Sequence, residues 1–141
     1  MKLSRPFVRM GELILVDAKL SGPRGEGEYQ LVLDTGAAAT TLLPEIVEEL
    51  GYSARDGIRP KTMRSALSEE VGYTLTVAEV SVLGVTTSDF EVHVFDLDHQ
   101  GFDGLLGMNF LRHFNFEVRP VDQQILLELI SGDWSPVLDE E

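Results

Sequence analysis

The sequence predicts a mostly β protein with one or two short helices. Apolar and polar residues alternate along several segments, which is the period of a half-buried strand. Gly, Pro and Ser stand between these segments, and only two stretches carry the end signals of a helix. At 141 residues the chain is long enough for one domain with a core and too short for two of ordinary size.

Two β-type runs come early in the chain. They cover Glu12–Leu20 and Glu28–Gly36, and the sequence SGPRGEG between them contains the residues of a hairpin loop. We therefore expect these two strands to pair antiparallel.

The segment PEIVEELGY predicts the first short helix. Pro44 suits the first helical turn, acidic residues follow it, and Gly51 is a stop signal. The second helix is predicted over GMNFLRHF, which follows DGLLG. Its Phe and Leu residues could form a partner-binding face, but they are more typical of a face turned to the core.

The remaining strands are predicted in the second half of the chain. YTLTVAEVSVLGV and SDFEVHVFDL alternate, and QQILLELI supplies a late strand. We find no internal repeat and no linker. We assign residues 1–11 to an N-terminal arm, residues 12–130 to a single domain and residues 131–141 to an acidic, partly ordered C-terminal tail. The candidate core positions are Val77, Val80, Val82, Phe90, Val92 and Val94.

Composition excludes several classes of function. The net charge of -13 argues against nucleic acid and anionic membrane surfaces as partners. No run approaches the length of a membrane span, and the N-terminus lacks the apolar stretch of a signal peptide, so the cytoplasm is the expected location. The absence of cysteine excludes disulfides, thiol catalysis and Cys-ligated metal.

One carboxylate stands where a hydrophobic strand ends, in the sequence YQLVLDTGAAATTLLP. We expect Asp34 to be partly desolvated, and desolvation raises the pKa of a carboxyl group unless a partner offsets it. Thr35 offers a hydroxyl, and the amide of Gly36 can approach a carboxylate or a substrate closely. The group is suited to hold a reactive acid, although an isolated Asp-Thr-Gly is more often only a turn after a strand.

The context of the triplet is more specific. Apolar residues precede Asp34, Ala37 follows the glycine and Thr40 lies six residues after the aspartate, and this stretch resembles the active-site loop of the retropepsin-like aspartic proteases. The second motif of that family is a hydrophobic pair followed by glycine, before a short helix and a final strand. DGLLGMNFLRHFNFEV has this form, with the motif at Leu105, Leu106 and Gly107. The resemblance runs from about Glu12 to Ile130.

Between the two motifs, MRSALSEEVGYTLTV occupies the place of the family's flap hairpin, which closes over the bound peptide. It has Gly72 but lacks the paired glycines of viral members, and its tip is more acidic. The flap residues implied by the resemblance are Leu67, Ser68, Glu69, Glu70, Val71 and Gly72.

The resemblance implies a closed β-barrel of the acid-protease type, with one lobe per chain, and the activity of an aspartic endopeptidase. Its chemistry needs two carboxylates, because one takes a proton from water while the other gives one to the scissile carbonyl oxygen. Asp-Thr-Gly occurs once, so the second carboxylate is expected from a second subunit. In such a homodimer a twofold axis places Asp34 beside its own copy, and the two carboxylates share a proton.

The same resemblance implies roles for the other motif residues. Thr35 hydrogen-bonds across the twofold axis, and Gly36 orients the carboxylate and binds the substrate backbone. Thr40 steadies the loop from beneath, and Leu105 and Leu106 pack under it. The substrate is an extended polypeptide held by main-chain hydrogen bonds. No cofactor is expected.

Other interpretations remain. His93, His99 and His113 lack the spacing of a metal site. The phosphatase pattern needs a second aspartate two positions after the first, where Gly36 stands. The basic cluster RDGIRPKTMR could bind an anion, although a solvated loop before the flap is the more ordinary interpretation. The rival from another class is a catalytically silent, dimeric peptide-binding module of the same fold.

Overall fold

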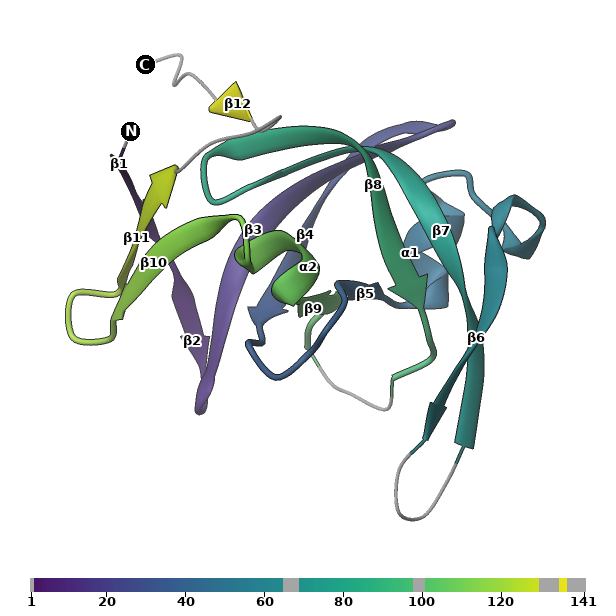
Figure 1. Cartoon of the computed structure of the whole chain (residues 1–141), viewed down its shortest axis with the longest axis horizontal. Helices are drawn as coiled ribbons and strands as arrows, with labels where there is room; N and C mark the ends of the chain where they lie inside the picture. The colour runs from purple at the N-terminus through teal and green to yellow at the C-terminus, as the bar shows by residue number, and fades with distance from the viewer. Residues whose placement is uncertain (1, 65–68, 98–100, 130–134, 137–141) are drawn as a thin grey trace.

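The structure, a computed structural model, describes residues 2–64, 69–97, 101–129 and 135–136. Strands dominate it, and the predicted mostly β fold with short helices is confirmed (Figure 1). The helical elements are α1 (Pro44–Glu49), the 3-10 turn η1 (Ala54–Asp56) and α2 (Met108–Leu111). The strands are β1 (Lys2–Pro6), β2 (Val8–Met10), β3 (Leu13–Gly22), β4 (Gly25–Leu33), β5 (Thr41–Leu42), β6 (Arg59–Arg64), β7 (Glu69–Val82), β8 (Val85–Val94), β9 (Gly104–Leu106), β10 (Phe114–Arg119), β11 (Gln124–Leu129) and β12 (Ser135–Pro136).

The larger sheet closes on itself. Its strand order is β12-β8-β5-β9-β4-β3-β7-β6, and β2 pairs with β3 outside this path. Because β7 pairs with β8 as well as with β3, the strands from β8 to β7 form a ring of hydrogen-bonded neighbours. A smaller sheet of β1, β11 and β10 lies at the end of the molecule opposite the β6–β7 hairpin (Figure 1).

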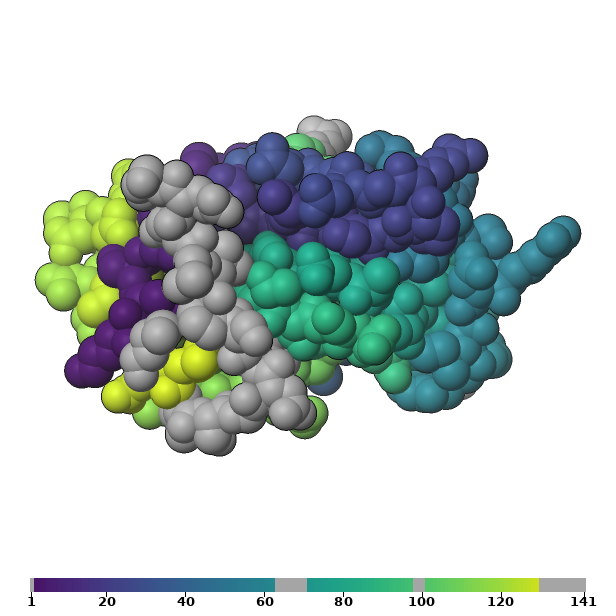
Figure 2. Space-filling view, turned by 90° about the horizontal axis from the view of Figure 1, so that it is seen from above, coloured from purple at the N-terminus to yellow at the C-terminus, as the bar shows by residue number. Residues whose placement is uncertain are grey.

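The predicted β3–β4 hairpin is confirmed. The two strands pair antiparallel from Leu15 opposite Val32 to Gly22 opposite Gly25. Side chains alternate along β3, with Val16, Ala18 and Leu20 buried, because successive residues point to opposite faces of a sheet. Figure 2 shows the β3–β4 hairpin beside the β7–β8 hairpin on one face of the molecule.

The first predicted helix is also present. α1 begins at Pro44 and buries Ile46 and Val47. The chain leaves the helix at Gly51, whose φ of +100° is a conformation that glycine adopts without steric cost. The second helix is shorter than expected, with four residues, and its Phe110 and Leu111 are buried as a core-facing helix requires.

The core fills the interior of the ring. Phe110 packs edge-on against Phe90, with ring centroids 6.1 Å apart, and lies 5.2 Å from Phe114. Burying each such side chain contributes about 1.5–3 kcal/mol. All the core positions predicted on β7 and β8 are buried, namely Val77, Val80, Val82, Phe90, Val92 and Val94.

A tyrosine bridges two strands where the sheet is irregular. The β7–β8 register pairs the residues on either side of Ala78 and Asp89 but not these two, and Asp89 has a φ of +53°. The N–H of Ala78 instead donates to the hydroxyl of Tyr52 at 2.9 Å. That hydroxyl donates in turn to the carbonyl oxygen of Ser21 on β3 at 3.0 Å, so the N–H of Ala78 keeps a partner at the irregularity.

Two segments have more structure than the sequence indicated. The basic segment expected as a solvated loop contains β6, which pairs antiparallel with β7. Pro60 and the charged side chains of β6 are typical of an edge strand, which needs no second ladder of hydrogen bonds. Residues 2–10, assigned to an N-terminal arm, form β1 on β11 and β2 on β3. No helix within the described part of the chain is long and apolar enough to cross a membrane.

Candidate active site

The two sequence motifs lie side by side because β4 and β9 pair in parallel. Val32 lies opposite Leu105, and Leu33 lies opposite Leu106. The N–H of Asp34 extends the ladder by donating to the carbonyl oxygen of Leu106 at 3.0 Å. β9 also pairs with β5, and a side chain at Gly104 would collide with the carbonyl oxygen of Thr41. The Asp-Thr-Gly loop therefore leaves the sheet between two strands that fix its start.

The Asp34 carboxylate is held by its own loop. It is half-buried, and its Oδ1 accepts the N–H of Gly36 at 2.9 Å. The N–H of Ala37 donates to the carbonyl oxygen of Asp34 at 3.2 Å, which closes the turn. Thr35 and Gly36 are exposed. The loop thus presents an oriented carboxylate, a hydroxyl and a glycine at the surface of the chain.

Thr40 ties the other end of the loop to α2. Its side chain is buried, at 2 % exposure. The Thr40 hydroxyl donates to Oδ1 of Asn109 at 2.8 Å and accepts the N–H of Gly107 at 3.1 Å. A side chain at Gly107 would collide with the backbone of Ala39. The loop and α2 are therefore in close contact, as expected if Thr40 supports the loop from beneath.

Asn109 is the residue that sequence reasoning missed. Its Oδ1 also accepts the backbone N–H of Thr40 at 2.7 Å, and its Nδ2 donates to the carbonyl oxygen of Glu91 at 2.9 Å. The backbone N–H groups of Met108 and Asn109 donate to the carbonyls of Ala37 and Ala38, so the loop also satisfies the first turn of α2. The available signal was one carboxamide within the apolar sequence GMNFL.

The two leucines of the second motif differ in burial. Leu106 is fully buried at 0 % exposure, as expected for a side chain packed under the loop. Leu105 is only half-buried. Adjacent residues of a strand point to opposite faces, so Leu106 faces the core and Leu105 the other face of the sheet.

The face that carries Leu105 continues across the sheet as a row of paired residues. Directly paired residues on neighbouring strands place their side chains on the same face. By alternation along β4, Asp34 follows Val32 on this face. From β4 to β6 the row consists of Val32, Leu105, Thr41, His93, Thr74 and Arg59.

The β6–β7 hairpin projects from the body where the flap was expected (Figure 1). Val71 and Gly72 lie within β7, and Val71 is 70 % exposed. A side chain at Gly72 would collide with the carbonyl oxygen of Val94 and approach the ring of Phe95 within 2.8 Å, so β7 crosses the end of β8 closely at this glycine. Glu69 and Glu70 begin β7, whereas Leu67 and Ser68 lie outside the described residues.

The ionisable groups near the row are concentrated around His93. Arg59 donates to the carboxylate of Glu91 at 2.8 Å. Burial lowers the pKa of His93, the charges of Lys61 and Arg59 lower it further, and Glu91 raises it. The pKa of His113, beside Arg112, is lowered mainly by burial. His99 lies outside the described residues, within which no group of three or more His, Asp or Glu side chains is placed to hold a metal ion.

The ring of strands, the parallel β4–β9 pair and the loop between β4 and β5 together define a retropepsin-like fold. Residues 24–113 match the family described as "gag-polyprotein putative aspartyl protease", and the chain belongs to that family. Among solved structures the chain is similar to a retropepsin-like aspartic protease from Rickettsia conorii, with 21% identity over 92% of each chain and a TM-score of 0.69. A comparison with curated proteins finds no match.

Proposed function

We propose that the protein is an aspartic endopeptidase that works as a homodimer, with Asp34 of each subunit forming the catalytic pair. The observation that carries this proposal is the Asp34 carboxylate, oriented by the N–H of Gly36 on a loop anchored at both ends. Membership of an aspartyl protease family supports it. Asp-Thr-Gly occurs once in the sequence, so one chain supplies only half of the site.

The surface position of the site fits a cleft completed by a second copy. Thr35 and Gly36 are exposed although Leu31 and Val32, shortly before them on β4, are buried. In a twofold arrangement each chain offers the same surface to the other, so both loops meet at the axis. The Thr35 hydroxyl would then hydrogen-bond to the partner loop, and the two Asp34 carboxylates would share one proton.

The proposed reaction uses the two carboxyl groups in turn. The ionised group accepts a proton from water, whose oxygen attacks the scissile carbonyl carbon, while the protonated group donates its proton to the carbonyl oxygen. The tetrahedral intermediate collapses as a proton passes to the amide nitrogen and the C–N bond breaks. The substrate is an extended peptide between the loop and the β6–β7 hairpin, with Leu67–Gly72 as its flap.

The alternative is a dimeric module of the same fold that binds peptide without cleaving it. Asp34, Thr35 and Gly36 are all present, and a module freed from catalysis has no need of the hydrogen bond that orients the carboxylate. We therefore favour the enzyme.

The test is the variant Asp34→Asn assayed on a peptide library. The amide keeps the shape of the side chain but cannot serve as the base, so we expect cleavage to fall to background while circular dichroism and sedimentation remain those of the wild type. Cleavage retained by Asp34→Asn would refute the aspartic-protease mechanism. Wild-type chain that cleaves nothing but binds peptides would favour the binding module.

The shared site is tested by mixing subunits. Excess Asp34→Asn chain should reduce wild-type activity after subunit exchange, because each mixed dimer holds one carboxylate where the reaction needs two. An excess of a chain unable to dimerise, or of an unrelated protein, is the control. Undiminished activity in the mixture, together with sedimentation as a monomer, would contradict the homodimeric site.

A further inference from the structure

The row of paired residues next to Asp34 is polar at its centre. Thr41, His93 and Thr74 occupy neighbouring positions on β5, β8 and β7. Thr74 is 1 % exposed, and its Oγ1 has no hydrogen-bond partner within the described ranges. The imidazole of His93 is half-buried and likewise makes no hydrogen bond to a described residue. A buried polar group without a hydrogen-bond partner is rare because it is costly, so the Thr74 hydroxyl calls for an explanation.

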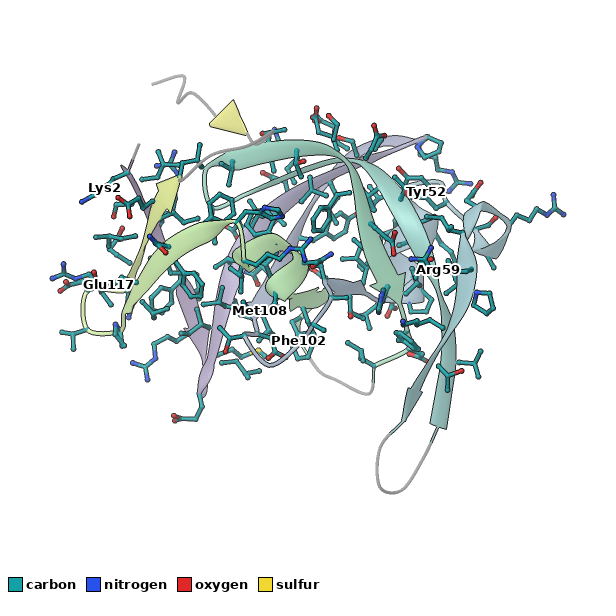
Figure 3. All side chains as sticks on the ribbon, viewed as in Figure 1. Lys2, Tyr52, Arg59, Phe102, Met108 and Glu117 are labelled. Atoms are coloured by element: carbon teal, nitrogen blue, oxygen red, sulfur yellow. The ribbon has the colours of Figure 1, made fainter. Side chains whose placement is uncertain are left out.

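An exposed lysine on the hairpin lies beside this polar group. Lys61 is on β6, two residues from Arg59 and opposite Gly72, on the face of the hairpin turned toward the end of β8. Arg59 is neutralised by Glu91, whereas Lys61 is exposed and forms no ion pair in the described part of the chain. Figure 3 labels Arg59 on this side of the molecule, far from Lys2 and Glu117 in the smaller sheet.

The effect of Lys61 reaches His93. After burial, its positive charge is the strongest influence on the pKa of His93, ahead of Glu91 and Arg59. Of the three charges that shift the pKa of His93, two are positive, in a chain whose net charge is -13. The other charged groups near His93 are Asp34, on the same face, and Asp89, Glu91 and Arg112, which line the adjoining hollow.

The space beside His93 leads to the catalytic loop. A hollow of about 400 Å³ is bounded by His93, Ala39 and Asn109 among others. Ala39 belongs to the loop that starts at Asp34, and Asn109 holds that loop through Thr40. Through Ala39 and Asn109 the hollow beside His93 thus adjoins the loop that carries Asp34.

We propose that Lys61 and His93, with Thr41 beside them, form a cationic specificity pocket that binds a glutamate or aspartate side chain of the peptide substrate. The proposal rests on the proposed function and names its substrate class. Lys61 supplies only donors, and an imidazole N–H beside it gives a carboxylate a second donor. Bonds of this kind contribute about 1.5–3 kcal/mol, equivalent to a tenfold or larger preference for an acidic over an isosteric neutral side chain.

The experiment compares peptides that differ only in Glu, Gln or Lys at one position, moved in turn along the substrate. Wild type should show a kcat/KM at least about tenfold higher for Glu than for Gln at one position. Lys61→Met should bring that ratio close to one, Lys61→Glu should favour Lys, and His93→Gln should lower the ratio in part. Lys19→Met, the same loss of charge on β3, is the matched control and should leave the ratio unchanged.

Two results would contradict the proposed specificity pocket without contradicting the proposed protease activity. These are equal wild-type rates on acidic and neutral peptides, and an equal effect of Lys61→Met and Lys19→Met on the ratio. If wild type cleaves no peptide, the proposed function fails. The specificity pocket is then tested by the binding of the same peptides to the Asp34→Asn chain, measured by fluorescence anisotropy. Tighter binding of the Glu peptide that Lys61→Met abolishes supports it, and equal binding of the Glu and Gln peptides refutes it.

Discussion

At the scale of single residues, the Asn109 side chain connects three segments that are distant in the sequence. It accepts two hydrogen bonds from Thr40 and donates one to the carbonyl of Glu91. Through these bonds the Asp34 loop, α2 and β8 keep fixed positions relative to one another. In the proposed site Asn109 is a positioning residue, because it holds the loop of Asp34 through Thr40.

Asn109→Ala should therefore lower the free energy of unfolding by about 1–3 kcal/mol, since it leaves two donors and one carbonyl without their partner. It should also reduce kcat more than it raises KM, because the carboxylate loses its orientation. Asn109→Asp keeps an oxygen for Thr40 and should restore part of both. The control is Asn115→Ala, which removes an exposed bond to Glu128. Equal urea midpoints for Asn109→Ala and Asn115→Ala would contradict this role.

Some residues of the site could be predicted from the sequence, and others could not. Asp34, Gly36 and Leu106 stand in short motifs, and local chemistry is enough to single them out. Asn109 gains its proposed role from the packing of α2 against the loop at Thr40, and Lys61 from the pairing of β6 with β7 opposite Gly72. No local pattern encodes such contacts between distant segments, so they became visible only in the fold.

At the scale of elements, the β6–β7 hairpin depends on the one glycine where it passes over β8. The Cβ of any other residue at Gly72 would meet the carbonyl oxygen of Val94. The sequence indicated the hairpin but placed its start too late, because Pro60 and the neighbouring charges are typical of a loop. The same residues are equally compatible with an edge strand, and only the pairing with β7 distinguishes an edge strand from a loop.

Gly72→Ala should push β7 away from β8 and lower the free energy of unfolding by about 1–3 kcal/mol, the usual cost of overpacking. Because the hairpin also carries Lys61, we expect the KM for peptides to rise more than kcat falls. Val71→Ala in the same strand removes an exposed side chain and should change the stability by no more than about 0.5 kcal/mol. Thermal unfolding of both variants makes the comparison. A Gly72→Ala chain as stable as wild type would show that β7 has room to move.

At the scale of the whole molecule, two histidines make stability depend on pH. The pKa values of His93 and His113 are lowered in the folded state, mainly by burial, below the ordinary value of 6.5. Between the folded and unfolded pKa values the unfolded chain binds more protons. Stability is therefore fully present above 6.5 and falls as the pH drops through the folded pKa values.

We expect the free energy of unfolding, measured in urea, to decrease from pH 7.5 toward pH 5, and the decrease to be smaller in His93→Gln/His113→Gln. Protonation of carboxylates adds its own slope in both chains, so the difference between the two proteins is the relevant quantity. An identical slope in both would contradict the contribution of the histidines. A carboxylate pair with one shared proton works on the acid side, so activity and stability should have different optima.

The pairing of β4 with β9 also fixes when the protein can begin to act. The Asp34 loop is complete only when the chain near residues 104–109 has joined it, about half the chain length further along. Contacts so distant in sequence form late in folding, because a long loop must close, with a loss of chain entropy, before these contacts can stabilise the fold. During synthesis Asp34 leaves the ribosome long before the segment that holds its loop. With the proposed function, each chain would stay inert until most of it has been made, and neither it nor its neighbours would be cleaved prematurely.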